Sequence, residues 1–157
     1  MFGRIDIRAK LPRGKGIWPA FWMLPEKNTF GTWPKSGELD IMELIGSEPS
    51  KVHGTLHFGP GPGSTQISRS FTLPAGSFYD EFHVFSIIWK QDQIQWLIDG
   101  NVFSTANKAD FGAVQYPFNE EFYLLSNMAV GGNWPGSPDA STTFPQHLVV
   151  DYVRVYQ

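Results

Sequence analysis

Residues 3–10 read Gly3-Arg4-Ile5-Asp6-Ile7-Arg8-Ala9-Lys10, a stretch in which apolar and charged side chains alternate. Successive side chains of a β-strand point to opposite faces, so Ile5, Ile7 and Ala9 are expected on one face and the charged residues on the other. Residues 149–156 alternate in a similar way near the end of the sequence. Both segments are therefore expected to be β-strands.

A second stretch, residues 93–103, reads Gln93-Ile94-Gln95-Trp96-Leu97-Ile98-Asp99-Gly100-Asn101-Val102-Phe103 and predicts a β-hairpin that turns at Asp-Gly-Asn. Similar short runs recur between clusters of Gly, Pro, Asn and Asp. The segments expected to be strands are 2–11, 20–24, 37–44, 52–58, 66–73, 83–90, 93–98, 102–105, 122–130 and 148–156. A weak helix signal appears around residues 106–111. About ten short strands without intervening helices predict an all-β protein, an antiparallel β-sandwich or jelly roll.

The composition fits a β-rich domain with many turns and an aromatic-lined surface. Aromatic residues make up 15% of the chain and charged residues 17%, against about 25% charged in an average domain. This profile excludes a disordered chain, a coiled coil and a collagen-like protein. The net charge of -3 provides no basic field for nucleic acid or an anionic membrane, and the lack of Cys excludes disulfides and thiolate chemistry. A length of 157 residues predicts one domain over residues 1–157.

The densest group of acidic side chains lies in Gly37-Glu38-Leu39-Asp40-Ile41-Met42-Glu43-Leu44. In a regular strand Glu38 and Asp40 share a face and Glu43 points to the other, whereas a one-residue bulge near 41–42 would bring all three onto one surface. Glycoside hydrolysis requires two such carboxyl groups, one ionised and one protonated, and mutual repulsion separates their pKa values. Taken alone, however, the spacing fits a solvated strand face or an oxygen-ligated calcium site better than it fits catalysis.

Tryptophans near this segment favour a sugar-binding surface. Trp18 and Trp22 are four residues apart and share one face of an extended segment, Trp33 precedes the acidic stretch, and Trp134 lies in a glycine-rich loop. Flat indole rings pack against the apolar faces of sugar rings. A single Trp is more often a core residue, but four of the six Trp in or beside loops and the acidic segment are less easily explained as core alone.

Two histidines alternate with Thr55 along residues 52–58, so that His53, Thr55 and His57 share a polar face. If this strand neighbours the acidic one, His57 could contact a carboxylate or a sugar hydroxyl. His53 is expected to be an ordinary surface residue.

These motifs together resemble family 16 glycoside hydrolases. Residues 37–43 are similar to the E-[IL]-D-[IV]-x-E signature of that family, and residues 150–156 are similar to its last strand. Residues 16–24 and 131–136 resemble its laminarinase branch, the bacterial endo-1,3-β-glucanases.

The resemblance implies a concanavalin-like jelly roll with a concave sugar-binding cleft and hydrolysis of laminarin-like β-1,3-glucans with retention of configuration. It makes Glu38 the nucleophile, Glu43 the general acid/base and Asp40 an assisting carboxylate. The extra residue between Asp40 and Glu43 matches the bulged form of the motif. The residues expected to line the cleft are Trp18, Trp22, Trp33, His57 and Trp134.

The resemblance also sets expectations for cofactors, assembly and location. No cofactor is expected to be required, although Asp151 resembles a position that binds a structural calcium on the convex side in some members. The family domain normally begins several strands before Gly3, so the first strands are expected to be missing. The open sheet edges are then expected to pair in a homodimer or to leave a marginally stable monomer, unless the sequence is a fragment of a longer gene product. The expected location is extracellular or periplasmic, although the opening residues do not have the pattern of a signal peptide.

Two alternative functions stay open. One is another family 16 specificity, for mixed-linkage glucan, agar or carrageenan. The other is a non-catalytic β-sandwich carbohydrate-binding module, which would have no use for Glu38 and Glu43 together.

Overall fold

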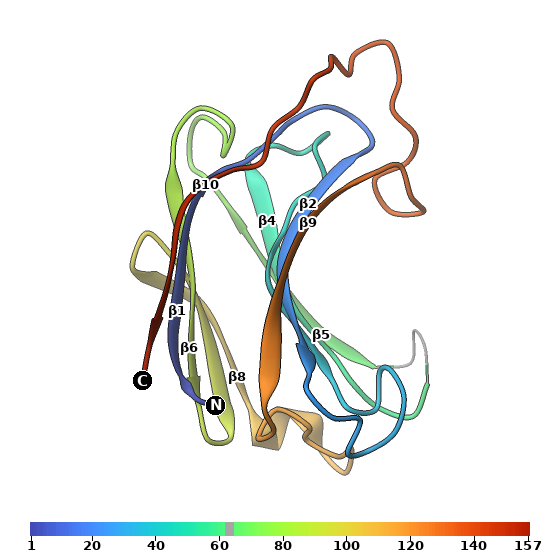
Figure 1. Ribbon diagram of the computed structural model, residues 1–157, viewed down its shortest axis with the longest axis vertical. Coiled ribbons are helices and arrows are strands. Elements are labelled where there is room, and N and C mark those ends of the chain that lie inside the picture. Colours follow the sequence, from blue (N-terminus) through green and yellow to red (C-terminus); the bar gives the residue numbers. More distant parts are fainter. Residues whose placement is uncertain (62–64) are drawn as a thin grey trace.

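Two antiparallel sheets of five strands each pack face to face in the computed structural model, which describes residues 1–61 and 65–157 (Figure 1). The strands of the first sheet are β1 (Gly3–Lys10), β6 (His83–Lys90), β7 (Gln93–Ile98), β8 (Asn101–Asn107) and β10 (Val149–Tyr156). Those of the second sheet are β2 (Ile17–Pro25), β3 (Glu38–Glu43), β4 (Lys51–His57), β5 (Gln66–Thr72) and β9 (Phe122–Val130). The strand orders are β10-β1-β6-β7-β8 and β5-β4-β3-β2-β9. The predicted antiparallel β-sandwich is confirmed.

The strand ends lie close to their predicted positions, with β2 as the exception. It begins at Ile17 instead of residue 20, because β9 pairs with it as far as Val130. Pro19 lies inside the strand without an N–H to donate, and its carbonyl accepts a hydrogen bond from the Leu44 N–H at 3.2 Å. The weak helix signal corresponds to a single 3-10 turn, η1 (Lys108–Phe111). Among the described residues, no helix is long and apolar enough to cross a membrane.

The predicted hairpin joins β7 to β8 through a two-residue turn. Ile98 pairs with Asn101, and the turn residues Asp99 and Gly100 have φ angles of 50° and 81°. Positive φ at both positions is the requirement of the turn type that matches strand twist, which is why Asp-Gly is favoured there. The Asp99 carboxylate also accepts a hydrogen bond from the Val84 N–H at 2.8 Å and so ties the turn to β6.

The core lies between the two sheets and is built from their inward-facing side chains. Ile5, Ile7 and Ala9 are buried, as the alternation in β1 predicted. Phe21 of the second sheet and Phe85 of the first bring their ring centroids to 6.3 Å across the core. The largest fully buried side chains include Trp96, Phe21, Phe58, Phe78, Phe85 and Phe118. Asp6 differs from its expected place on an exposed charged face: it is 8% exposed, and Arg4 Nε donates to it at 2.7 Å.

Strands β9 and β10 are edge strands, as are β5 and β8 at the opposite edges of the two sheets. Both β9 and β10 are less buried than the central strands. Seven of the eight residues of β10 are exposed, so the alternation expected for residues 149–156 does not become an alternation of burial. The reason is position, because β10 has a neighbouring strand on one side in the described structure. Val153 and Val155 are 46% and 62% exposed as a result.

Phe21→Ala is expected to lower the free energy of unfolding by about 3–5 kcal/mol, because it leaves a cavity between the sheets. Phe21 is 1% exposed, so the site has little solvent to fill the space. Val102→Ala on the exposed surface of β8 is the control and should change stability by less than about 0.5 kcal/mol. Urea denaturation followed by fluorescence measures both, and equal losses would show that Phe21 is not part of a tightly packed core.

Candidate active site

A β-bulge in β3 places Glu38, Asp40 and Glu43 on one face of the second sheet. Opposite β4 the register shifts between Asp40 and Glu43, so that Ile41 and Met42 together face a single residue. Ile41 and Met42 both turn into the core, where they are 3% and 0% exposed. The three acids line a hollow on the other face. The bulge predicted near residues 41–42 is therefore confirmed.

A groove made of three adjoining hollows crosses the outer face of this sheet, which is concave in Figure 1. Their volumes are about 500, 220 and 420 Å³, and Glu38 lines all three. The groove lies over β5, β4, β3, β2 and β9 and carries all the residues expected to bind sugar, Trp18, Trp22, Trp33, His57 and Trp134. The sequence-predicted site is thus brought together in one place.

Burial keeps the carboxyl group of Glu43 protonated at neutral pH. Desolvation, followed by the charge of Asp40, raises the pKa of Glu43 to about 8. The indole N–H of Trp18 donates to Glu43 Oε1 at 3.1 Å, and this hydrogen bond lowers the pKa of Glu43 and so offsets part of the rise. Glu43 is therefore suited to donate a proton near neutral pH.

Glu38 is also partly buried, and one hydrogen bond stabilises its carboxylate form. Desolvation and the charge of Asp40 raise the pKa of Glu38 to about 7. The Trp33 indole N–H donates to Glu38 Oε2 at 2.6 Å and stabilises the carboxylate. The pKa values of both glutamates are thus raised toward neutral pH, where one carboxyl group can be ionised while the other is protonated, as a nucleophile and an acid require.

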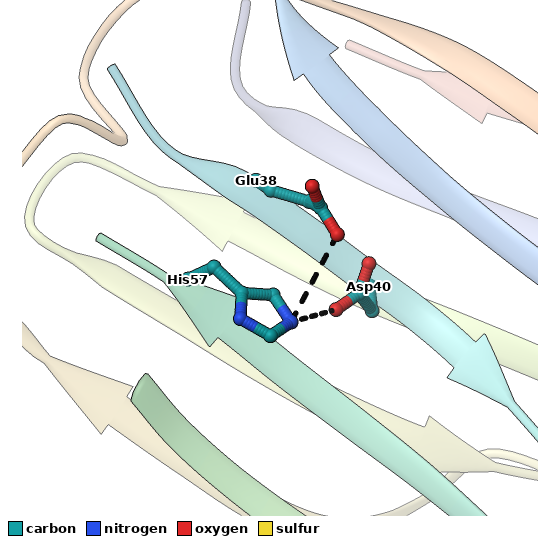
Figure 2. Close-up of side chains that lie close together, drawn as sticks. All are labelled: Glu38, Asp40 and His57. Atoms are coloured by element: carbon teal, nitrogen blue, oxygen red, sulfur yellow. Dashed lines mark ion pairs between the residues drawn. The ribbon is translucent and has the colours of Figure 1, made fainter. Parts of the chain in front are cut away.

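Asp40 follows Glu38 on β3, and His57 reaches it from β4 (Figure 2). His57 Nε2 is 3.1 Å from Asp40 Oδ2 and 3.8 Å from Glu38 Oε1. Burial raises the pKa of Asp40, which is 2% exposed, and His57 opposes that rise. Burial alone would lower the pKa of His57, but the hydrogen bond and charge of Asp40 outweigh it and the pKa is raised. The predicted contact of His57 with a carboxylate is confirmed.

The tryptophans are held in fixed orientations while much of their surface stays accessible. Trp33 and Trp134 are 45% and 41% exposed, so they are available for stacking on a ligand. Trp134 packs edge to face on Trp18 at 5.4 Å between ring centroids. His53 packs in the same manner on Trp134 at 5.1 Å and is half-buried, so it supports the aromatic surface rather than lying free on the protein surface. Burial and then the charge of Lys51 lower the pKa of His53, which favours its neutral form.

Strand β9 contributes two further residues to the groove, which the sequence patterns do not single out. Asn127 and Tyr123 line the groove, and Asn127 Oδ1 accepts the Trp22 indole N–H at 2.8 Å. Alternation along residues 122–130 places these two side chains on one face. Alternation does not predict which strand pairs with β9. Its pairing with β2 brings Asn127 and Tyr123 close to the tryptophans.

One group of three side chains in residues 1–61 and 65–157 could hold a metal ion. It consists of Glu38, Asp40 and His57, whose ligand atoms all lie within 4.8 Å of one another. Calcium prefers oxygen ligands, and His57 supplies nitrogen. The spacing of the acids in residues 37–44 was also compatible with a calcium site made of oxygen ligands. The group of Glu38, Asp40 and His57 does not have that composition.

Asp151, the residue expected at a structural calcium, lies against a cationic side chain. Arg8 Nη1 donates to Asp151 Oδ2 at 2.6 Å, so a guanidinium already neutralises this carboxylate. Calcium takes about 6–8 oxygen ligands, and the described residues bring no cluster of three acidic side chains to Asp151. These residues do not by themselves fit calcium, and the calcium site stays a prediction.

The family model for glycosyl hydrolases family 16 matches residues 1–154. The chain belongs to glycosyl hydrolases family 16. Its match covers the acidic strand, the tryptophans and both sheets, so the resemblance seen in the separate motifs extends to the whole fold.

Solved structures similar to this family 16 chain confirm the jelly roll. The laminarinase catalytic domain from Thermotoga maritima MSB8 is 44% identical with a TM-score of 0.94, over 99% of this chain and 64% of that one. The endo-beta-1,3-glucanase from Pyrococcus furiosus is 48% identical with a TM-score of 0.92, over 98% and 60%. Glucan endo-1,3-beta-glucosidase A1 from Niallia circulans is 43% identical over 99% of this chain and 24% of its own length. The chain therefore spans less than two thirds of each of these relatives.

Glu43→Gln is expected to stabilise the fold at pH 8 and to change little below pH 4.5, because the unfolded chain ionises this group near 4.5 while the folded protein keeps its proton up to about 8. Between these values the folded state binds more protons, so the free energy of unfolding falls as pH rises. One pKa unit corresponds to about 1.4 kcal/mol, which gives the variant an advantage of roughly 2–4 kcal/mol at pH 8.

Melting curves of Glu43→Gln and wild type over this pH range test the linkage. Glu81→Gln, at an exposed position, is the matched control and should show no such trend. A melting difference for Glu43→Gln that is constant with pH would contradict the raised pKa.

Proposed function

We propose that the chain carries the active site of a retaining endo-β-1,3-glucanase that cleaves laminarin-like β-glucans. The observation that carries the proposal is the placement of Glu38, Asp40 and Glu43 on one face of β3, in the floor of an open groove lined by tryptophans. Hydrolysis with retention needs one carboxylate as nucleophile and one carboxylic acid as proton donor. The groove offers both.

The match to the family motif assigns the two roles, Glu38 as nucleophile and Glu43 as acid. The Trp33 indole N–H at 2.6 Å stabilises the Glu38 carboxylate, and burial favours the protonated form of Glu43. Glu38 attacks the anomeric carbon and forms an ester bond, while the bond to the leaving oxygen breaks and Glu43 gives that oxygen its proton. Glu43, now ionised, takes a proton from water; the hydroxide cleaves the ester and restores the Glu38 carboxylate.

Asp40 and His57 adjust the charge on the nucleophile. The hydrogen bond between the side chains of Asp40 and Glu38 raises the pKa of Glu38 and opposes the rise in that of Asp40, so Glu38 donates in it and Asp40 accepts. Asp40 is thus placed to take up the proton that Glu38 gives up before attack. The positive charge favoured on His57 offsets part of the repulsion among the three acids.

The shape of the groove supports attack within a chain rather than at its end. Hollows lie beside Glu38 toward Tyr123 and toward Trp134, so a polymer can extend to both sides of the acids. Exposed indole faces at Trp33 and Trp134 suit the apolar faces of sugar rings.

The β-1,3 linkage is proposed from the relatives, whose names are laminarinase and endo-beta-1,3-glucanase. Because the chain spans part of their lengths, the activity of the whole protein belongs to the proposal. Mixed-linkage glucan, agar and carrageenan are the competing substrates. A purely sugar-binding role is disfavoured because two glutamates with raised pKa values serve no purpose in binding alone.

Location and assembly are proposals as well. An extracellular or periplasmic location follows from a substrate too large to enter a cell. The proposed homodimer is supported by the exposed apolar side chains of Val153 and Val155 on the edge strand β10. Light scattering of the purified chain tests it.

Glu38→Gln should lower the release of reducing sugar from laminarin by several orders of magnitude, because it removes the nucleophile. Glu43→Gln should lower it by about 10²–10⁴-fold on substrates with poor leaving groups and less on activated aryl glycosides. A panel of laminarin, lichenan, agarose and carrageenan identifies the substrate. Near-normal rates for Glu38→Gln, with Glu81→Gln as the control, would reject the assignment of the nucleophile.

Trp134→Ala should weaken the binding of laminarin oligosaccharides by about threefold to tenfold with little loss of stability, because an exposed stacking face is removed. The experiment is calorimetric titration in a Glu38→Gln background, which prevents turnover, together with a melting curve. Val102→Ala, on the opposite sheet, is the control. A large drop in melting temperature with unchanged affinity would show that Trp134 serves packing alone.

A further inference from the structure

Trp96 of the first sheet makes a hydrogen bond through the core to the strand that carries the acids. Its indole Nε1–H donates to the backbone carbonyl oxygen of Asp40 at 2.8 Å, and the contact is buried. Trp96 lies on β7, far from β3 in sequence, and its side chain is fully buried. It does not itself line the groove.

The carbonyl that Trp96 contacts lies where the ladder of β3 is interrupted. The register with β4 shifts after Asp40, and the register with β2 shifts between the partners of Asp40 and Met42. A bulge leaves a backbone group without its usual strand partner, and a buried carbonyl without a partner is unfavourable. The Trp96 N–H supplies that partner from the other sheet and so favours the bulged conformation over a regular strand.

Gly54 leaves the space in which the indole fits. A Cβ at this position would lie 2.5 Å from Trp96 Cδ1 and 2.6 Å from Nε1, closer than packed atoms approach. Gly54 is also the single residue of β4 that faces Ile41 and Met42 across the bulge. The glycine, the bulge and the indole thus meet at one point under the acids.

We propose that Trp96 is a positioning residue for the reaction: its hydrogen bond to Asp40 fixes the bulge and thereby the spacing of Glu38 and Glu43. The inference rests on the function proposed above, since spacing matters to a reaction that uses both glutamates. Loss of the N–H lets β3 relax and displaces Glu43 relative to Glu38. A misplacement of about 1 Å can lower a rate by about 10²-fold without any change in the reacting groups.

The chain contains a matched control for the chemical change. Trp89 is also buried, and its Nε1–H donates to a backbone carbonyl, that of Phe118, at 2.8 Å. Its acceptor lies outside β3. Trp96→Phe and Trp89→Phe therefore each remove one buried indole-to-carbonyl hydrogen bond, and they differ in whether that bond is attached to the acidic strand.

The test compares both variants with wild type in kcat and KM on laminarin, in melting temperature, and in dependence on leaving-group pKa with aryl glycosides. Trp96→Phe is expected to lower kcat by about tenfold to a hundredfold while KM stays within about twofold of the wild-type value. The loss of kcat should be largest for substrates with poor leaving groups. Trp89→Phe is expected to lose stability but to keep kcat within about twofold. Equal kcat for the two variants would overturn the proposal.

Two further measurements keep the test decisive. If Trp96→Phe does not fold, benzothienylalanine at position 96 keeps the shape of the indole and replaces its N–H by sulfur, and unchanged kcat in that protein overturns the proposal. Carbon-13 titration of the Glu38 and Glu43 carboxyl groups needs no turnover: both titrations should shift in Trp96→Phe and stay in place in Trp89→Phe. Wild type that cleaves none of the polysaccharides would reject the proposed function, while the titration would still decide the role of Trp96.

Discussion

The bulge in β3 is the constraint on which the groove depends, because a strand without it cannot present three acids to one side. Two consecutive residues, Ile41 and Met42, both turn into the core there. In a regular strand the alternation would send Glu43 inward instead, into the packed space between the sheets. The same extra residue therefore completes the core and completes the acidic site, so packing and chemistry select the same backbone conformation.

The acidic site lowers stability, and its neighbours offset part of that loss. Burial raises the pKa values of Glu38, Asp40 and Glu43, which means that their charged forms are poorly solvated in the fold. Indole N–H groups from Trp33 and Trp18 donate to the two glutamates at 2.6 and 3.1 Å, and these bonds also fix the side chains in place. A rigid sandwich tolerates such a site because most of its core lies away from it.

Much of the fold could be predicted because strand alternation is a local property. The faces of β1 and the turn at Asp99 and Gly100 could be predicted from a few neighbouring residues. The bulge in β3 was implied by the resemblance to the family motif, because alternation alone sends Glu43 to the other face. The long-range partners could not be predicted, because alternation fixes which way a side chain points and not what it meets. The bond from Trp96 to Asp40 joins residues 56 positions apart in different sheets, and the support that His53 gives Trp134 depends on a loop packing over β4.

Strand β9 forms one side of the groove and is held less firmly than β3, the strand that carries the acids. None of its residues is fully buried, and in the described part of the chain it pairs with β2 alone, whereas four of the six residues of β3 are buried between two neighbours. Edge strands of this kind open by local unfolding more readily than central ones. When β9 opens, Trp22 loses the Asn127 oxygen that orients its ring. If the groove binds sugar as proposed, any group that pairs with the other edge of β9 will raise the fraction of molecules in which Trp22 is oriented for it. Sugar binding will in turn slow the exchange of those β9 amides that pair with β2.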